Sequence, residues 1–191
     1  MSIRARAVRI VEAGGPEVLQ LDDVDVRDPE AGEVRVRVHA SGLNRADVLQ
    51  RKGFYPAPPG VAADIPGLEY AGIVESVGTD VQQWTVGDRV MGILAGGGMC
   101  THAVMDAREV ISIPATWSMT DAAGVPEAFM TAFDAIYAQA RLGPGETVLI
   151  HSVASGVGTA AFQMVQALGG RAIGTSRTPW KLARCAEMGL K

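Results

Sequence analysis

The chain has 191 residues, 48% of them hydrophobic and 20% charged, with 23 glycines and 10 prolines. This composition is typical of a folded, turn-rich chain with one large or two small domains. The net charge is −4 and no basic stretch stands out, so we expect no nucleic-acid partner. Cys100 and Cys185 lie far apart, outside any C-x-x-C spacing, which argues against a disulfide framework or a cysteine zinc cluster and favours the cytoplasm. No run approaches the ~18 apolar residues of a membrane span, so no membrane association is expected.

Short strands separated by glycine turns dominate residues 1–120. The clearest is Val34–Ala40, where apolar and polar residues alternate strictly, a pattern typical of a half-buried strand. His39 falls on its polar face, so we expect a solvent-exposed histidine and not a ligand. A helix is expected at Ala46–Gln50, before a loop rich in proline and glycine. The expected strands cover residues 5–11, 18–26, 34–40, 73–77, 89–93, 100–105 and 110–113, a spacing that predicts a small β-barrel-type domain.

Residues 121–191 change to an alternation of helices and strands. Pro126 and Glu127 are typical of a helix start, and apolar residues at helical spacing extend that helix to Ala140. The remaining elements expected are strands at 147–150 and 171–175 and helices at 159–168 and 181–188. The predicted fold class is therefore α+β and α/β, with a β-barrel-type domain at 1–120 and an α/β domain at 121–191.

The stretch Thr147–Leu168 carries the clearest functional pattern. An apolar run that suits a strand buried on both faces is followed by Gly156-Val157-Gly158 and then by a helical period. Strand, glycine turn and helix form the opening of a dinucleotide-binding βαβ unit, in which free backbone N–H groups and the helix dipole favour a pyrophosphate. The alternative is that these glycines only make a tight turn.

Six segments, taken together and in order, resemble one protein family. They are residues 14–19, 41–47, 67–72, 85–90, 125–132 and 151–161. With them the chain resembles the medium-chain dehydrogenase/reductase superfamily. Within it, the chain resembles the zeta-crystallin-like NADPH quinone oxidoreductases, and most of all their p53-inducible branch. The resemblance implies a GroES-like catalytic domain at 1–120 and a partial Rossmann NADP-binding domain at 121–191.

Two positions separate this chain from the zinc-dependent members of that superfamily. Those members have a cysteine in the Asn44 slot and a histidine in the Leu68 slot. Zinc in proteins needs thiolate, imidazole or carboxylate donors, so no metal is expected here. The resemblance then implies a zinc-independent reductase that transfers hydride from NADPH to a small-molecule quinone or activated enone.

The resemblance also implies roles for four residues on the reacting side. Asn44 and Thr131 are expected against the nicotinamide ribose and ring, Tyr55 as a phenol on the substrate side, and Asp47 as an orienting group. Each has a structural alternative. Asn44 and Asp47 suit a helix start, Tyr55 suits a loop anchor, and the Thr131 hydroxyl suits a bond to its own helix backbone.

The phosphate end of the cofactor is expected on two loops. After the first Rossmann strand it should contact the glycine turn at Ser155, Gly156, Val157 and Gly158. Ser155 stands where the superfamily often has glycine, and His151 is expected to be a structural or substrate-edge residue.

The loop after the second strand predicts which cofactor binds. NAD-binding units usually place an acid there, whereas this chain has hydroxyls and cations that suit a 2′-phosphate. NADPH is therefore expected on Thr175, Ser176, Arg177 and Lys181. The alternative is that the two cations are solvated surface charges.

The resembling family continues beyond residue 191 with the rest of the Rossmann sheet and a return segment. We therefore expect a truncated or partly recorded chain, or one completed by another polypeptide, and a homodimer only at full length. Two other functions stay open. One is an NADPH-dependent 2-enal or enoyl reductase on the same scaffold, and the other is a non-catalytic NADPH-binding protein.

Overall fold

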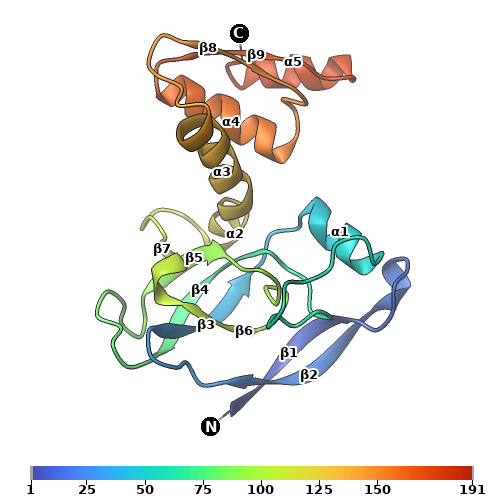
Figure 1. The fold of residues 1–191 in the computed structure, drawn as a ribbon, viewed down its shortest axis with the longest axis vertical. Helices are drawn as coiled ribbons and strands as arrows, with labels where there is room; N and C mark the ends of the chain where they lie inside the picture. Colours follow the sequence, from blue (N-terminus) through green and yellow to red (C-terminus); the bar gives the residue numbers. More distant parts are fainter. Residues whose placement is uncertain (1, 191) are drawn as a thin grey trace. The chain divides into compact units, whose positions relative to one another are not determined.

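The computed structural model describes residues 2–190, and the chain forms two compact units, Met1–Glu127 and Ala128–Lys191 (Figure 1). The first unit is mostly antiparallel β-structure, and the second alternates strands and helices. The helix α3 (Pro126–Phe133) begins in the first unit and continues into the second. Among residues 2–190, none of the helices has the length and apolar character needed to cross a membrane.

The first unit contains a five-stranded sheet and a separate hairpin. The sheet has the order β6-β3-β4-β5-β7, and every neighbouring pair is antiparallel. Its strands are β3 (Glu33–Ala40), β4 (Glu69–Val77), β5 (Arg89–Ile93), β6 (His102–Asp106) and β7 (Val110–Ser112). The hairpin pairs β1 (Ser2–Ile10) with β2 (Leu19–Arg27).

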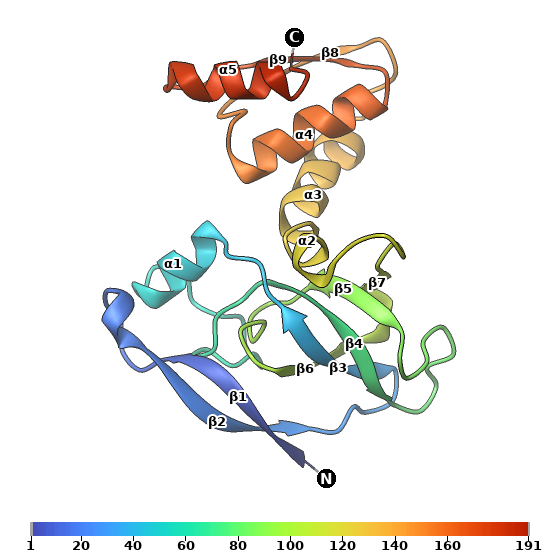
Figure 2. The ribbon, with the colours of Figure 1, turned by 180° about the vertical axis from the view of Figure 1, so that it is seen from behind.

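Two short helices accompany these strands. The helix α1 (Arg45–Arg51) lies beside the turn of the β1–β2 hairpin in both views (Figures 1 and 2), and there the Gly14 N–H donates to the Arg51 carbonyl at 3.0 Å. The helix α2 (Met119–Ala123) packs its alanines on the sheet, in a core cluster with Ala71, Met91 and Ile113. The sequence analysis missed α2, because five residues are too few to show a helical period.

The alternation predicted for β3 is confirmed at Val34 and Val36, which are fully buried in the main core of the sheet. His39 is exposed, as expected. Arg35 departs from the pattern, because it lies between these valines and yet is only 8% exposed. Its guanidinium pairs with Asp28 at 2.7 Å and with Glu75 at 3.1 Å. The polar face of this strand is thus covered by ion pairs at Arg35, and exposed at His39.

The strand β4 begins four residues before the strand predicted at 73–77. Its first residues pair with β5, from Glu69 opposite Ile93 to Gly72 opposite Val90. A buried acid and a glycine in this run hide the strand from an analysis of apolar periodicity, because neither residue favours a strand on its own. The position of Glu69 at the strand start proves important for the site.

The second unit is built on two parallel strands, β8 (Thr147–Ile150) and β9 (Arg171–Gly174). The helix α4 (Gly156–Ala167) connects them, and α5 (Pro179–Glu187) follows. Phe162 and Val165 of α4 are fully buried in the core of this unit. The prediction that β8 is buried on both faces is wrong for the described residues. Leu149, whose side chain lies opposite the core face, is 53% exposed.

The helix predicted around residues 129–140 is present with one change of geometry. After α3 the chain continues as a π-helical segment, Asp134–Gln139, in which the Ala140 N–H donates to the Ala135 carbonyl at 3.0 Å. Apolar spacing does not distinguish a π-turn from an α-turn over so few residues. Phe133 and Tyr137 stack across the change, with ring centroids 5.0 Å apart.

Candidate functional site

A polar pocket in the second unit lies where the loops after β8 and β9 meet. Ligands of parallel α/β sheets bind at these carboxyl ends of the strands. The pocket has a volume of about 170 Å³ and is lined by Ser152, Ala154, Ser155, Ser176, Arg177, Thr178 and Lys181. Four residues predicted for cofactor binding therefore come together here. The sequence analysis did not select Ser152, Ala154 and Thr178, although all three lie in the two stretches that it singled out.

The glycine turn contains two glycines with different surroundings. Ser155 is the N-cap of α4, and its Oγ accepts from the Gly158 N–H at 3.0 Å. Gly158 is buried, and a Cβ there would lie 2.6 Å from the Ser152 carbonyl oxygen, so this glycine permits close packing of loop and helix. Gly156 is exposed, and a Cβ there would meet only the Ala128 Cβ, at 4.0 Å. The tight-turn alternative thus describes Gly158, whereas the backbone at Gly156 is open to a ligand.

The charge of the pocket is positive. Arg177 and Lys181 are exposed, and neither takes part in an ion pair among the residues that the structure describes. The Lys181 ammonium lies 5.6 Å from the centroid of the Trp180 ring. No Asp or Glu lines this pocket. Two cations beside several hydroxyls suit an anion such as a phosphate ester.

Three other predicted residues of this half lie outside the pocket lining. The Thr175 Oγ1 is 3.0 Å from His151 Nδ1, so these two side chains pair with each other. Val157 is 38% exposed on the first turn of α4. Thr131 lies on α3 with an exposed side chain. Their cofactor roles stay predictions.

In the first unit, hydrogen bonds join residues of two predicted segments, 41–47 and 67–72. Asn44 is the N-cap of α1, and its Nδ2 donates to the Glu69 Oε1 at 2.8 Å. Asp47, 7% exposed, accepts from the Asn44 N–H at 2.7 Å and from the Gly67 N–H at 3.0 Å. The structure therefore brings Asn44 and Asp47 together, and the capping alternative describes how both are held. Whether they also contact a cofactor stays a prediction.

Glu69 is the residue of this cluster that the sequence analysis did not select. Its side chain is buried, 3% exposed, and its second oxygen accepts from the Glu127 backbone N–H at 2.9 Å. The sequence pattern that could have identified Glu69 is a single acid at the start of the apolar run 70–74. Burial raises the pKa of the Glu127 carboxyl, and the nearby charges of Glu69 and Asp47 raise it further.

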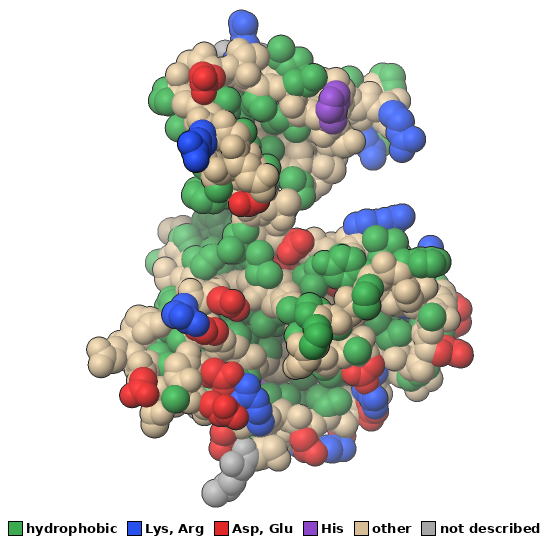
Figure 3. Space-filling model, viewed as in Figure 1, with side chains coloured by type: hydrophobic (Ala, Val, Ile, Leu, Met, Phe, Trp, Pro, Cys, Tyr) green, Lys and Arg blue, Asp and Glu red, His purple; other side chains and the backbone are tan. Residues whose placement is uncertain are grey.

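Tyr55 lies in the loop after α1, 43% exposed, and forms no hydrogen bond with Asn44 or Asp47 in the described chain. Leu43, before α1, and Phe54, next to Tyr55 in the sequence, are 85% and 76% exposed. Figure 3 shows hydrophobic side chains gathered over α1 and the loop that follows it. The role of Tyr55 on the substrate side stays a prediction.

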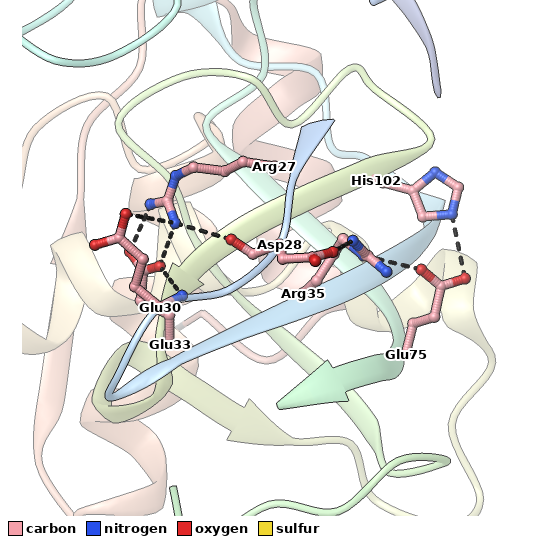
Figure 4. A network of polar contacts seen from close by, with 7 residues as sticks. All are labelled: Arg27, Asp28, Glu30, Glu33, Arg35, Glu75 and His102. Atoms are coloured by element: carbon pink, nitrogen blue, oxygen red, sulfur yellow. Dashed lines mark hydrogen bonds and ion pairs between the residues drawn. The ribbon is translucent and has the colours of Figure 1, made fainter. Parts of the chain in front are cut away.

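A second acid of β4, Glu75, has a different environment (Figure 4). It accepts from Arg35 at 3.1 Å and lies 3.5 Å from His102 Nε2. The same network continues through Asp28 to Arg27, Glu30 and Glu33. Here each acid has a cationic neighbour, so this cluster is a structural ion-pair network.

Comparisons with known proteins identify the fold. Residues 30–115 match the family described as "Alcohol dehydrogenase GroES-like domain". The chain is 37% identical over 173 residues to a quinone oxidoreductase of Rattus norvegicus. The matched region covers 90% of this chain and 52% of that protein. It is 45% identical over 161 residues to polyketide synthase GfsB of Streptomyces halstedii, covering 84% of this chain and 3% of the synthase. The crystal structure of CurK enoyl reductase matches with a TM-score of 0.89 at 33% identity, covering 98% of this chain and 58% of that one.

These matches define the class of protein: residues 30–115 match the alcohol dehydrogenase GroES-like domain, and the similarity along the chain to quinone oxidoreductases and enoyl reductases supports the medium-chain dehydrogenase/reductase superfamily. The predicted fold class, a GroES-like domain followed by a Rossmann-type part, is confirmed. The chain spans about half the length of the quinone oxidoreductase that it matches. Because its relatives include both quinone oxidoreductases and enoyl reductases, membership of the p53-inducible branch stays a prediction.

Proposed function

We propose that this chain carries the GroES-like domain and the phosphate-binding loops of a zinc-independent, NADPH-dependent quinone reductase of the zeta-crystallin-like group. The observation that supports this function best is the acid-free pocket at the carboxyl ends of β8 and β9, which gathers Ser176, Arg177 and Lys181. An enzyme that used NADH would be expected to place an acid in this loop.

The residues of the second unit fit the phosphates of this cofactor. Arg177 and Lys181 would bind the 2′-phosphate, with the hydroxyl groups of Ser176 and Thr178 as further donors. The open backbone at Gly156 and the start of α4 would hold the pyrophosphate. The bound cofactor would supply the hydride, and the protein would orient the acceptor and keep water from the reacting atoms.

The chemistry of two residues supports zinc independence. The Asn44 amide is a poor zinc ligand, and it already donates to Glu69. Leu68 is a buried hydrocarbon side chain, 6% exposed. Among residues 2–190, no three His, Cys, Asp or Glu side chains converge in a way that could hold a metal ion. A homodimer at full length and a cytoplasmic location also remain part of the proposal.

Cofactor affinity tests the proposal. We expect the protein to bind NADPH more tightly than NADH in titration calorimetry. Arg177→Ala should weaken NADPH binding about tenfold by removing a charge-assisted bond, and should leave NADH binding unchanged. Arg171→Ala, an exposed arginine of the same unit outside this pocket, is the matched control and should change neither. Equal affinity of the wild-type protein for NADPH and NADH would refute the cofactor assignment.

The second candidate is an NADPH-dependent 2-enal or enoyl reductase. The similarity to the CurK enoyl reductase and to a polyketide synthase favours it. Oxidation of NADPH with an aromatic ortho-quinone and with a 2-alkenal would rank the two acceptors, and faster turnover of the alkenal would replace the first proposal. Tight NADPH binding without turnover of either acceptor would instead indicate a non-catalytic NADPH-binding protein.

A further inference from the structure

Three of the segments that resemble the family meet at one carboxylate. Glu69, from segment 67–72, accepts from the Asn44 side chain of segment 41–47. Its other oxygen accepts from the backbone N–H of Glu127, in the first turn of α3 and in segment 125–132. Glu69 therefore joins its own segment to two others and is well placed to control the geometry of all three.

The local backbone is shaped around this acid. A Cβ added at Gly42 would overlap the Glu69 carboxyl group, so only glycine leaves room for it two residues before Asn44. Gly42 thus makes room for the hydrogen bond between segments 41–47 and 67–72, and does not form a left-handed turn.

The electrostatics of this position are unfavourable for a purely structural role. None of the ion pairs formed by residues 2–190 involves Glu69 or Asp47, although both are buried. A buried charge without a cation is costly even when it is hydrogen-bonded. The two groups that donate to Glu69, the Asn44 amide and the Glu127 backbone N–H, are both neutral, so neither compensates the charge of the carboxylate.

What the charge does is fix the orientation of Asn44. A carboxylate offers only acceptors, so the group that Asn44 presents to it must be the NH₂ and not the oxygen. A glutamine at position 69 would offer one oxygen and one NH₂ to two donors, the Asn44 amide and the Glu127 N–H. One donor would then lose its partner, or the Asn44 amide would turn over.

We propose that Glu69 is a positioning residue that holds the Asn44 amide with its NH₂ toward the carboxylate, so that the amide oxygen, which faces the Asp47 backbone N–H in the capping box, can also accept from a hydroxyl group of the nicotinamide nucleotide. This inference rests on the proposed function, because the ligand of Asn44 is the cofactor assigned there. Glu69 itself contacts protein groups only, and acts through Asn44.

A double-mutant cycle tests it. Glu69→Gln should weaken NADPH binding about tenfold, the effect of losing one hydrogen bond of average strength. In the Asn44→Ala background the same change should have no further effect on the NADPH Kd. Glu75→Gln on the same strand is the matched control, and should leave the NADPH Kd unchanged. An equal effect of Glu69→Gln in both backgrounds would show that Glu69 acts through α3 and would overturn the proposal.

An exchange variant covers the case in which Glu69→Gln folds poorly. In Glu69→Gln/Asn44→Asp, the glutamine donates to the new carboxylate and accepts from the Glu127 N–H, so every group regains a partner. We expect this double variant to recover both thermal stability and NADPH affinity relative to Glu69→Gln. A double variant as weak as the single one in both measurements would contradict the pairing.

An observation without cofactor separates this inference from the function it rests on. The side-chain amide resonances of Asn44 in ¹H–¹⁵N spectra should shift in Glu69→Gln and stay unchanged in Glu75→Gln. If these shifts are observed and the wild-type protein does not bind NADPH, the proposed function is refuted and the orientation of Asn44 is confirmed. Unchanged Asn44 resonances in Glu69→Gln would refute the orientation itself.

Discussion

The two acids of β4, Glu69 and Glu75, lie six residues apart on one strand and are stabilised in opposite ways. Glu75 is half-buried and faces Arg35 and His102 in a network of alternating charges (Figure 4). Glu69 is more deeply buried and is held by an amide and a backbone N–H. The ion pairs of Glu75 stabilise the fold. The charge of Glu69 has no cationic partner, which indicates a role other than stability. This contrast locates the candidate site within a sheet that otherwise looks uniform.

The largest effect is expected where the ion-pair network is broken. Arg35→Ala would leave Asp28 and Glu75 without their shared cation on the polar face of β3. We expect a loss of about 3 kcal/mol in unfolding free energy, because a nearly buried arginine loses its packing and its charge-assisted hydrogen bonds to both acids. Urea denaturation measures this loss. Arg108→Ala, at a surface ion pair with an arginine side chain 85% exposed, is the control and should change little.

A smaller but more specific effect is expected at Gly42. Gly42→Ala would force the Glu69 carboxyl away from Asn44, because the new methyl group overlaps it. Overpacking of this kind costs about 1–3 kcal/mol, and NADPH affinity should fall as in Glu69→Gln. Gly124→Ala, where a Cβ meets no atom within 4 Å, controls for the loss of glycine flexibility. Wild-type NADPH affinity in Gly42→Ala would show that the site tolerates displacement of Glu69.

Tyr70 lies next to Glu69 on β4 and carries a buried hydroxyl. The side chain is fully buried, and its hydroxyl has no hydrogen-bond partner among the described residues. Burial, with a further contribution from the charge of Glu109, raises the pKa of this phenol far above its usual range. Tyr70→Phe should therefore leave thermal stability unchanged or raise it by up to about 1 kcal/mol. A clear loss of stability would indicate a partner for the hydroxyl, such as a buried water.

The sequence predicted best those features whose cause is local. The alternation of Val34 and Val36 depends on neighbouring residues, and it is present. The loops after β8 and β9 were also identifiable, because strand ends in a parallel pair meet at one edge. Within those loops Thr175 was expected in the pocket, but its hydroxyl pairs with His151. A choice between two partners for one hydroxyl depends on side-chain packing that no sequence pattern encodes.

Features that depend on distant partners were missed. The burial of Arg35 was not predicted, because it follows from an ion pair with Glu75, which is 40 residues away. Glu69 looked like part of a recognisable segment, and its role appears only when Asn44 and Glu127 are brought to it. In both cases the sequence gives the residue type, but the hydrogen-bonding partner that determines its role is brought close only by the fold.

The smallest change in stability is expected at Glu127. Its sign should differ between the cluster around Glu69 and the ion-pair network around Glu75. Burial first, and then the charges of Glu69 and Asp47, raise the pKa of Glu127 above its ordinary value of 4.5. The folded protein therefore holds this proton more tightly than the unfolded chain. The resulting stabilisation is fully present below the unfolded pKa and is lost as the pH rises through the folded pKa.

In Glu127→Gln the stability no longer falls as the pH rises through the folded pKa of Glu127, because glutamine stays neutral at every pH. We expect the variant to be more stable than wild type near neutral pH, with the advantage shrinking as the pH falls toward 4.5. Urea denaturation at both pH values measures the difference. Glu75→Gln should instead be destabilising near neutral pH, because it removes one of the two acids that pair with Arg35. If both variants lost stability at neutral pH, the Glu69 cluster would be an ordinary part of the fold, and the contrast between the two acids of β4 would carry no information about function.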